Sequence, residues 1–218
     1  MDFSSFKKQN RGVTQKIIDH PFMKELYQGQ LDFSIFKFFL KQDYNYLDQS
    51  MANMGILISK AEDINIRRKL IRVIYSESEV EFENYIKLLS SLKISPKEAG
   101  EVKLTRANIA YSNYLISQSV KGGFARGIAA LLPCYYSYLE VYKHHKSELK
   151  YNNNHLYLEW ASAYKEKSFE ELVSDLIEIL EKNITEENYQ ILLKTYSDSL
   201  KFEYEFLTDV YYKKRWDI

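Results

Sequence analysis

The chain has 218 residues with 30 basic and 30 acidic side chains, so its formal net charge is zero. That balance excludes the positive field that dominates binding to nucleic acids or anionic membranes. The first eight residues lack the apolar core of a signal peptide, and nowhere do about 18 uncharged apolar residues follow one another. Together with a single cysteine, which suits a reducing compartment, this predicts a soluble, cytoplasmic protein.

The spacing of apolar residues is helical along nearly the whole chain, with short polar or glycine-containing breaks. Only 7 glycines and 3 prolines leave few turns for a sheet. The pattern predicts an all-α, single-domain bundle over residues 1–218, with more helices than a four-helix bundle needs. The predicted helices span residues 3–18, 22–28, 34–61, 64–91, 104–120, 124–146, 154–166, 168–182 and 186–213.

Capping residues mark three helix starts. Ser34 is expected to cap the second long helix, and Thr185 to open the last one. Ser95 precedes Pro96 with the spacing of a capping box and proline at the first helical position.

Signals for phosphate or metal binding are weak. Segment 122–127 is rich in glycine but lacks the Walker lysine–serine pair and a preceding strand, so it predicts a helix junction where Gly123 and Gly127 let helices approach closely. No histidine follows a glutamate by three residues, and no Cys/His cluster exists, so no metal site is expected. His144 and His145 are expected at an exposed helix end.

Two carboxylates occupy positions where the helical pattern calls for an apolar side chain. Asp43 lies on the stripe that includes Phe36 and Met54, and Glu203 lies on the apolar stripe of the last helix. Buried carboxylates are rare unless they are paired, hydrogen-bonded or functional. Each carboxylate therefore has a functional interpretation and a structural one, an ion pair with Arg126, Arg106 or Lys41.

Cys134 is the only cysteine and cannot form an intramolecular disulfide. It lies in the aromatic run 131–140, on what is expected to be the first turn of a helix, with Tyr138 one turn away on the same face. A lone thiol is either a small core residue or a nucleophile, and burial alone does not distinguish the two.

Four segments in this order resemble the TenA family, the thiaminase II proteins: residues 20–22, 42–47, 132–138 and 203–206. The resemblance covers about residues 15–212 and, because Cys134 is retained, points to the cysteine-bearing group. It implies a haem-oxygenase-like all-α fold and a homotetramer. It also implies hydrolysis of 5-substituted 4-amino-2-methylpyrimidines to the hydroxymethylpyrimidine in thiamin salvage, without a metal or organic cofactor.

The resemblance also implies roles for individual residues. Cys134 would attack the ring carbon beside the substituted position, made more thiolate-like by a nearby helix N-terminus. Glu203 would bond the pyrimidine nitrogen and move protons, and Asp43 would hold the exocyclic amine. Tyr46 and Tyr138 match tyrosines that hydrogen-bond near the thiol.

Three more aromatic residues match pocket residues that hold or stack the ring: Tyr111, Tyr164 and Phe206. Core packing is the alternative for each of them. The chain departs from the family at Leu207, where tryptophan is common, and at Phe82, where many members have histidine.

The choice between thiamin and the aminomethyl-pyrimidine as the better substrate remains open, and so do two other functions. The first alternative function is that of a non-catalytic ligand-binding or regulatory protein, although zero net charge argues against direct contact with DNA. The other is a haem or quinone-cofactor oxygenase of the same fold, with His20 as a possible ligand.

Overall fold

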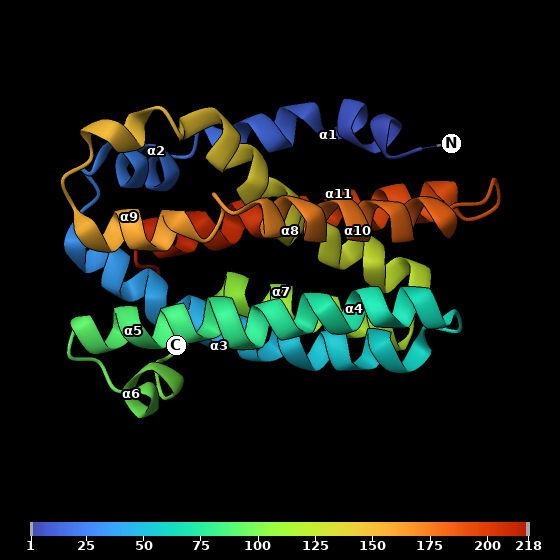
Figure 1. Ribbon diagram of the computed structural model, residues 1–218, viewed down its shortest axis with the longest axis horizontal. Coiled ribbons are helices and arrows are strands. Elements are labelled where there is room, and N and C mark those ends of the chain that lie inside the picture. The colour runs from blue at the N-terminus through green and yellow to red at the C-terminus, as the bar shows by residue number, and fades with distance from the viewer. Residues whose placement is uncertain (1, 217–218) are drawn as a thin grey trace.

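The computed structural model describes residues 2–216, apart from the side chain of Val80; Met1 and residues 217–218 of the predicted domain lie outside the described residues. Within this range the fold is all-α, as predicted, with no strand (Figure 1). In chain order the elements are α1 (Phe3–Ile18), α2 (Pro21–Gln28), α3 (Phe33–Lys60), α4 (Ile64–Ser76), a π-helical turn η1 (Glu77–Glu81), α5 (Phe82–Ser91), α6 (Pro96–Gly100), α7 (Arg106–Val120), α8 (Phe124–His145), a 3-10 turn η2 (Glu148–Tyr151), α9 (His155–Ser162), α10 (Lys167–Lys182) and α11 (Tyr189–Tyr211).

The predicted unbroken helix over residues 64–91 is wrong. The π-helical turn η1 divides it into α4 and α5, because the N–H of Phe82 bonds to the carbonyl of Glu77, five residues earlier. Apolar periodicity does not reveal one wider turn inside a helix. The short helix α6 was also missing from the predicted helices, although its first residues carried the capping signal.

The predicted caps fared unevenly. Ser95 caps α6, as expected. At α3 the prediction is wrong, because Asp32 is the cap and its carboxylate accepts a 2.8 Å hydrogen bond from the backbone N–H of Ser34. Thr185 accepts a 3.3 Å bond from the N–H of Asn188, but this closes a turn that precedes α11.

Long helices that cross at the centre of the molecule position the pocket described below. Helices α8 and α11 pack along each other, and α7 contacts both of them as well as α3. On the outside, α1 covers α8 and α11, while α4 lies beside α3 and α10 (Figure 1). Side chains of these elements form one hydrophobic core rich in Phe and Tyr.

Gly127 brings α8 close to α3 and α7, as the glycine spacing predicted. A Cβ atom there would lie 2.5 Å from Cδ2 of Leu57 and 2.5 Å from Oγ of Ser119, so no other residue fits without movement. Gly123 has a different role, because no atom lies within 4 Å of such a Cβ. Its φ of +86° starts α8 in a conformation that glycine adopts at low cost.

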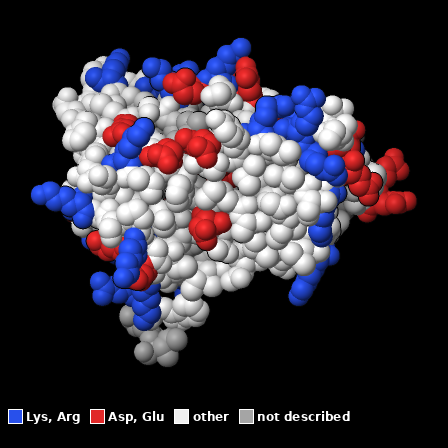
Figure 2. Space-filling model, turned by 60° about the horizontal axis from the view of Figure 1, so that its bottom comes forward, with Lys and Arg blue, Asp and Glu red and all other residues white. Residues whose placement is uncertain are grey.

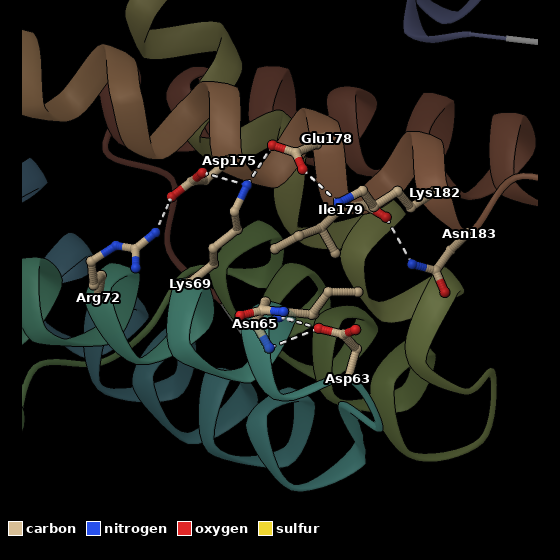
Figure 3. Close-up of polar contacts among 10 residues, drawn as sticks. Asp63, Asn65, Lys69, Arg72, Asp175, Glu178, Ile179, Lys182 and Asn183 are labelled. Carbon is tan, nitrogen blue, oxygen red and sulfur yellow. Dashed lines mark hydrogen bonds and ion pairs between the residues drawn. The ribbon is translucent and has the colours of Figure 1, made fainter.

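An ion-pair network joins α4 to α10 near the start of η1 (Figure 3). Nζ of Lys69 lies 2.8 Å from Asp175 and also contacts Glu178. Arg72 contacts the other oxygen of Asp175 at 2.9 Å, and Lys182 contacts Glu178 at 2.7 Å. Single surface pairs contribute little, but a shared network restrains the helices it joins. It therefore holds the last turns of α4, from which η1 continues.

On the face drawn in Figure 2, basic and acidic side chains lie mainly around a broad area that is uncharged apart from an acidic group near its middle, and no sign forms a continuous field. None of the described helices is both long and apolar enough to cross a membrane.

His144 is exposed, as predicted, but the prediction is wrong for His145, which is buried. The two ring nitrogens of His145 lie 2.9 Å from the carbonyl of Ile18 and 2.8 Å from Glu148.

Candidate active site

A pocket lies at the centre of the bundle, with an empty volume of about 450 Å³ that includes the open solvent at its mouth. It is bounded by α3, η1, α7, α8 and α11, together with Tyr164 from the turn after α9 and Phe169 from the first turn of α10. No Lys, Arg or His is among its lining residues, which are Asp43, Tyr46, Leu47, Glu77, Glu81, Tyr111, Cys134, Tyr135, Tyr138, Tyr164, Phe169, Glu203 and Phe206. The chain thus brings together carboxylates, phenols and one thiol in a largely buried space.

All of the residues expected to form a site line this pocket. They come from distant parts of the chain: Asp43 and Tyr46 from α3, Tyr111 from α7, Cys134 and Tyr138 from α8, Tyr164 from the turn after α9, and Glu203 and Phe206 from α11. The spacing of each pair within one helix turns both members to the same face.

The sequence indicated that Cys134 lies on the first turn of a helix, and this prediction is wrong. Cys134 lies well inside α8, directly after Pro133. A helix N-terminus therefore does not activate this thiol. Cys134 is half-buried although its neighbours along α8 are buried, and it lines the pocket.

The surroundings of Cys134 favour the protonated thiol. Burial raises its pKa well above the ordinary value, and the negative charge of Glu203 raises it further, whereas the nearby hydroxyl of Tyr46 acts in the opposite direction. The expectation of a more thiolate-like group is wrong for the empty pocket. The hydroxyl oxygen of Tyr46 is itself buried and has no hydrogen-bond partner among the described residues.

Glu203 lies on the buried face of α11, with 2% of its surface exposed. Burial and the nearby Asp43 raise the pKa of Glu203 to about 8, while the hydroxyls of Tyr111 and Tyr138 oppose the shift. Its Oε2 atom has no hydrogen-bond partner among the described residues. Glu203 is thus a carboxyl group that carries a proton near neutral pH and has a free oxygen.

Asp43 is buried on α3 and is held by a phenol. The hydroxyl of Tyr85 donates a short hydrogen bond to Oδ2 of Asp43, and Nε1 of Trp160 donates to the same phenol oxygen over 3.1 Å. The pKa of Asp43 is raised to about 7, mainly by burial. The hydrogen bond from Tyr85 opposes this shift, and the negative charge of Glu77 adds to it. Tyr85 and Trp160 thereby fix the carboxylate in place.

Neither Asp43 nor Glu203 forms the structural ion pair considered as an alternative. Among the described residues the three candidate cations lie elsewhere: Lys41 pairs with Glu98, Arg106 lies over the ring of Trp216, and the side chain of Arg126 lies beside Gly122. The charged neighbours that shift the pKa of either carboxyl group are acidic.

Flat aromatic walls flank the thiol. Tyr46 stacks on Tyr111 with ring centroids 5.1 Å apart, and Tyr138 stacks on Tyr164 at 5.3 Å. Phe206 lies 5.9 Å from Tyr46. These rings belong both to the core and to the pocket, so the two interpretations offered for Tyr111, Tyr164 and Phe206 are compatible.

Sequence reasoning did not select five further pocket residues: Leu47, Glu77, Glu81, Tyr135 and Phe169. The hydroxyl of Tyr135 donates a 2.8 Å hydrogen bond to Oε2 of Glu77. Glu77 is buried, and burial raises its pKa to about 7 while the Tyr135 bond and Ser50 lower it. The available signals were the position of Tyr135 beside Cys134 and the spacing of four between the glutamates.

The residues at which the chain departs from the family pattern lie in the packing. Leu207 is fully buried in the core. Phe82 packs on Tyr44 with ring centroids 5.2 Å apart, and it is not among the residues that line the pocket.

His20 is not among the pocket residues either. Its Nδ1 caps α2 by accepting a 3.2 Å hydrogen bond from the N–H of Phe22, and its Nε2 lies 3.3 Å from Oγ1 of Thr208. Burial lowers the pKa of His20 to about 4. No group of three His, Cys, Asp or Glu side chains in the described part of the chain could hold a metal ion.

Comparison with solved structures supports the same fold. The chain aligns with a TenA homologue from P. horikoshii at a TM-score of 0.91 and 31% identity, covering 97% of this chain and 98% of that one. A domain with a haem-oxygenase-like fold from Shewanella denitrificans aligns at a TM-score of 0.79 and 14% identity, covering 98% and 93% of the two chains. The second likeness concerns the fold alone.

Two relatives are named aminopyrimidine aminohydrolase. The protein from Halalkalibacterium halodurans is 27% identical over 91% of this chain and 90% of its own length. The protein from Helicobacter pylori is 25% identical over 94% and 97% of the two chains. The model of the TENA/THI-4/PQQC family matches residues 7–214. The chain therefore belongs to the TENA/THI-4/PQQC family.

Proposed function

We propose that the protein hydrolyses 5-substituted 4-amino-2-methylpyrimidines to 4-amino-5-hydroxymethyl-2-methylpyrimidine, a reaction of thiamin salvage. Family membership and relatives named aminopyrimidine aminohydrolase support this activity. The observation that carries it is the pocket itself, in which one accessible thiol shares an aromatic cavity with Asp43 and Glu203. A small, planar, nitrogen-rich ring matches stacking walls that end in carboxyl groups.

The proposed roles follow from the protonation states. Asp43, fixed by Tyr85, accepts hydrogen bonds from the exocyclic amine of the ring. Glu203, whose pKa is raised to about 8, donates its proton to a ring nitrogen and makes the ring more electrophilic. Tyr111, Tyr164 and Phe206 hold the ring, while Tyr46 and Tyr138 hydrogen-bond near the thiol.

Cys134 is the proposed nucleophile. As its sulfur adds to the ring carbon beside the substituted position, the thiol proton passes to Glu203, whose own proton has gone to the ring nitrogen. The bond from the exocyclic methylene to the 5-substituent breaks, and its electron pair leaves with that group. Water then adds to the methylene, the sulfur is expelled with recovery of its proton, and the aromatic ring is restored.

The test follows hydroxymethylpyrimidine by chromatography after incubation with 4-amino-5-aminomethyl-2-methylpyrimidine or with thiamin. Cys134→Ala should reduce turnover on the order of a thousandfold or more, and Glu203→Gln should also cause a large loss. Ser137→Ala is the matched control, because Ser137 is buried on the same helix but does not line the pocket. Equal turnover by Cys134→Ala and the unaltered enzyme would exclude thiol catalysis.

We also propose that the protein acts as a homotetramer in the cytoplasm, with residues 1–218 forming one domain. The single cysteine agrees with a reducing compartment. Light scattering coupled to size-exclusion chromatography measures the oligomer, and a monomer at micromolar concentration would contradict the tetramer.

A further inference from the structure

The pocket contains more acid than the proposed chemistry uses. Asp43, Glu77, Glu81 and Glu203 all line it, and no basic side chain is among the lining residues. Asp43 and Glu203 are assigned to the pyrimidine ring. Glu77 and Glu81 have no role in that scheme, although both lie close enough to Cys134 for their charges to raise the pKa of its thiol.

The π-helical turn η1 presents these two glutamates to the pocket. Glu77 and Glu81 are its first and last residues, and both line the pocket, whereas Glu79 between them is exposed. Isolated π-turns inside helices are frequent at functional sites. The π-helical turn thus directs the side chains of Glu77 and Glu81 into the pocket and that of Glu79 to the solvent.

In the part of the chain that the structure describes, no Lys, Arg or His lines the pocket beside the two inward acids. The charged groups that shift the pKa of Glu81 are Glu77 and Asp43, and these repulsions add to burial in raising it well above the ordinary value. Two carboxyl groups in a pocket wall, one buried and one half-buried, would be expected to face a Lys or Arg if they were kept only for structure. Glu203 adds a second sign of a missing partner, since its Oε2 is buried in the same pocket without a hydrogen bond.

We propose that Glu77 and Glu81 form a subsite for a positively charged 5-substituent of the pyrimidine, and that the occupant it fits best is a protonated primary amine. This inference rests on the proposed function, which puts the ring among Asp43, Cys134 and Glu203. An ammonium group offers three N–H donors to two neighbouring carboxyl groups, and its positive charge would favour their ionised forms. A thiazolium ring carries the same charge without an N–H donor, so the subsite favours the aminomethyl compound over thiamin.

The subsite also suits the bond that breaks. In the aminomethyl substrate the carbon–nitrogen bond cleaves with its electron pair going to nitrogen. Because the nitrogen enters with three protons, it leaves as neutral ammonia, and the charge that the carboxylates attracted is gone. Water supplies the hydroxyl of the product, whose neutral 5-substituent makes no ion pair and is free to leave the subsite.

The test compares binding of a charged and a neutral pyrimidine. In a Cys134→Ala background, which prevents turnover, calorimetry measures Kd for the 5-aminomethyl compound and for the 5-hydroxymethyl compound. Adding Glu77→Gln and Glu81→Gln should weaken binding of the aminomethyl compound by about tenfold or more, because hydrogen bonds to charged groups are the stronger kind. Binding of the hydroxymethyl compound should change less than about twofold.

Glu79→Gln is the matched control, since it removes one carboxylate from the exposed side of the same turn and should change neither Kd. If the double variant does not fold, Glu81→Gln alone carries the comparison, because Glu81 is only half-buried. Equal weakening of both ligands, or of neither, overturns the subsite. In the otherwise unaltered enzyme, the same pair of substitutions should lower kcat/KM for the aminomethyl compound more than for thiamin.

The two proposals can fail separately. Turnover of both compounds by the unaltered enzyme with no effect of the double variant on selectivity would remove the subsite and leave the function. Selective loss of charged-ligand affinity in a protein that hydrolyses neither compound would keep the subsite and remove the function. A protein that binds neither pyrimidine would overturn both.

Discussion

The hydroxyl of Tyr135 donates a 2.8 Å hydrogen bond to Oε2 of Glu77, which ties α8 to the π-helical turn immediately beside Cys134. The bond lowers the pKa of Glu77 against the effect of burial. It also fixes one oxygen of that carboxylate. The acidic turn is thereby joined to the residue that follows Cys134 in α8.

Tyr135→Phe should therefore reduce kcat/KM for the aminomethyl-pyrimidine by roughly tenfold, the usual effect of losing a hydrogen bond to a charged group. The pKa of Glu77 would rise, so activity that depends on its ionised form should begin at higher pH. A pH profile measures this shift. Tyr136→Phe is the control, because Tyr136 is a buried neighbour outside the pocket lining. An unchanged acid limb would show that Glu77 does not bind substrate as an anion.

Tyr85→Phe should lower the free energy of unfolding by about 1–3 kcal/mol, because it leaves Nε1 of Trp160 and a carboxylate oxygen of Asp43 buried without their partner. Urea unfolding followed by fluorescence gives the value. Tyr44→Phe, whose half-buried ring packs on Phe82, should cost less than about 0.5 kcal/mol. Similar losses in the two variants would mean that the hydrogen-bond chain adds no stability.

Gly127→Ala should destabilise the fold by about 1–3 kcal/mol, because the new methyl group would lie 2.5 Å from both Leu57 and Ser119. Gly55→Ala provides the matched comparison within α3. There no atom lies within 4 Å of the added Cβ, so helix propensity should dominate and stabilise by about 0.5–1 kcal/mol. Differential scanning calorimetry should show melting temperatures that move in opposite directions; a shift in the same direction would contradict the packing argument.

The contribution of Glu203 to the free energy of unfolding should fall as pH rises from about 4.5 to about 8, whereas the lowered pKa of His20 acts in the opposite direction between about pH 4 and pH 6.5. The folded-state pKa of Glu203 is raised from 4.5 to about 8, so over this range the folded state binds a proton that the unfolded state has released. Its contribution to stability is fully present below the unfolded pKa and is lost once pH passes the folded pKa. Asp43 and Glu77 act in the same direction up to about pH 7.

Glu203→Gln should flatten that dependence in urea unfolding carried out between pH 5 and pH 8, because the amide does not titrate. Glu79→Gln, an exposed substitution, should leave the slope unchanged. If the slope is the same in the Glu203→Gln variant, Glu203 does not keep its proton in the folded protein.

Much of the fold and the candidate site followed from helical periodicity. The positions of Asp43 and Glu203 on apolar stripes predicted that both side chains face inward, and both do. Because the stripes of several helices must meet in one core, residues that interrupt those stripes meet as well. The resemblance supplied the aromatic members of the set, and all of them line the pocket.

What the sequence did not reveal depends on long-range packing. The π-helical turn at Glu77–Glu81 has no local signature in the apolar pattern, so the two glutamates read as an ordinary charged helix surface. Likewise, the dominant effect on the Cys134 thiol is desolvation by the assembled pocket, whereas its position in the chain had indicated activation by a helix end. His145 is buried against α1, where its Nε2 contacts the carbonyl of Ile18, a residue far away in the sequence.

The protonated state of Cys134 has a consequence for the lifetime of the protein. Peroxides and alkylating agents react with the thiolate, and a thiol whose pKa is raised well above its ordinary value spends little time in that form at neutral pH. The three acids whose charges raise it are Glu203, Glu81 and Glu77. We therefore expect slow oxidation and alkylation of Cys134 in the protein without substrate, and faster reaction when a cation occupies the pocket.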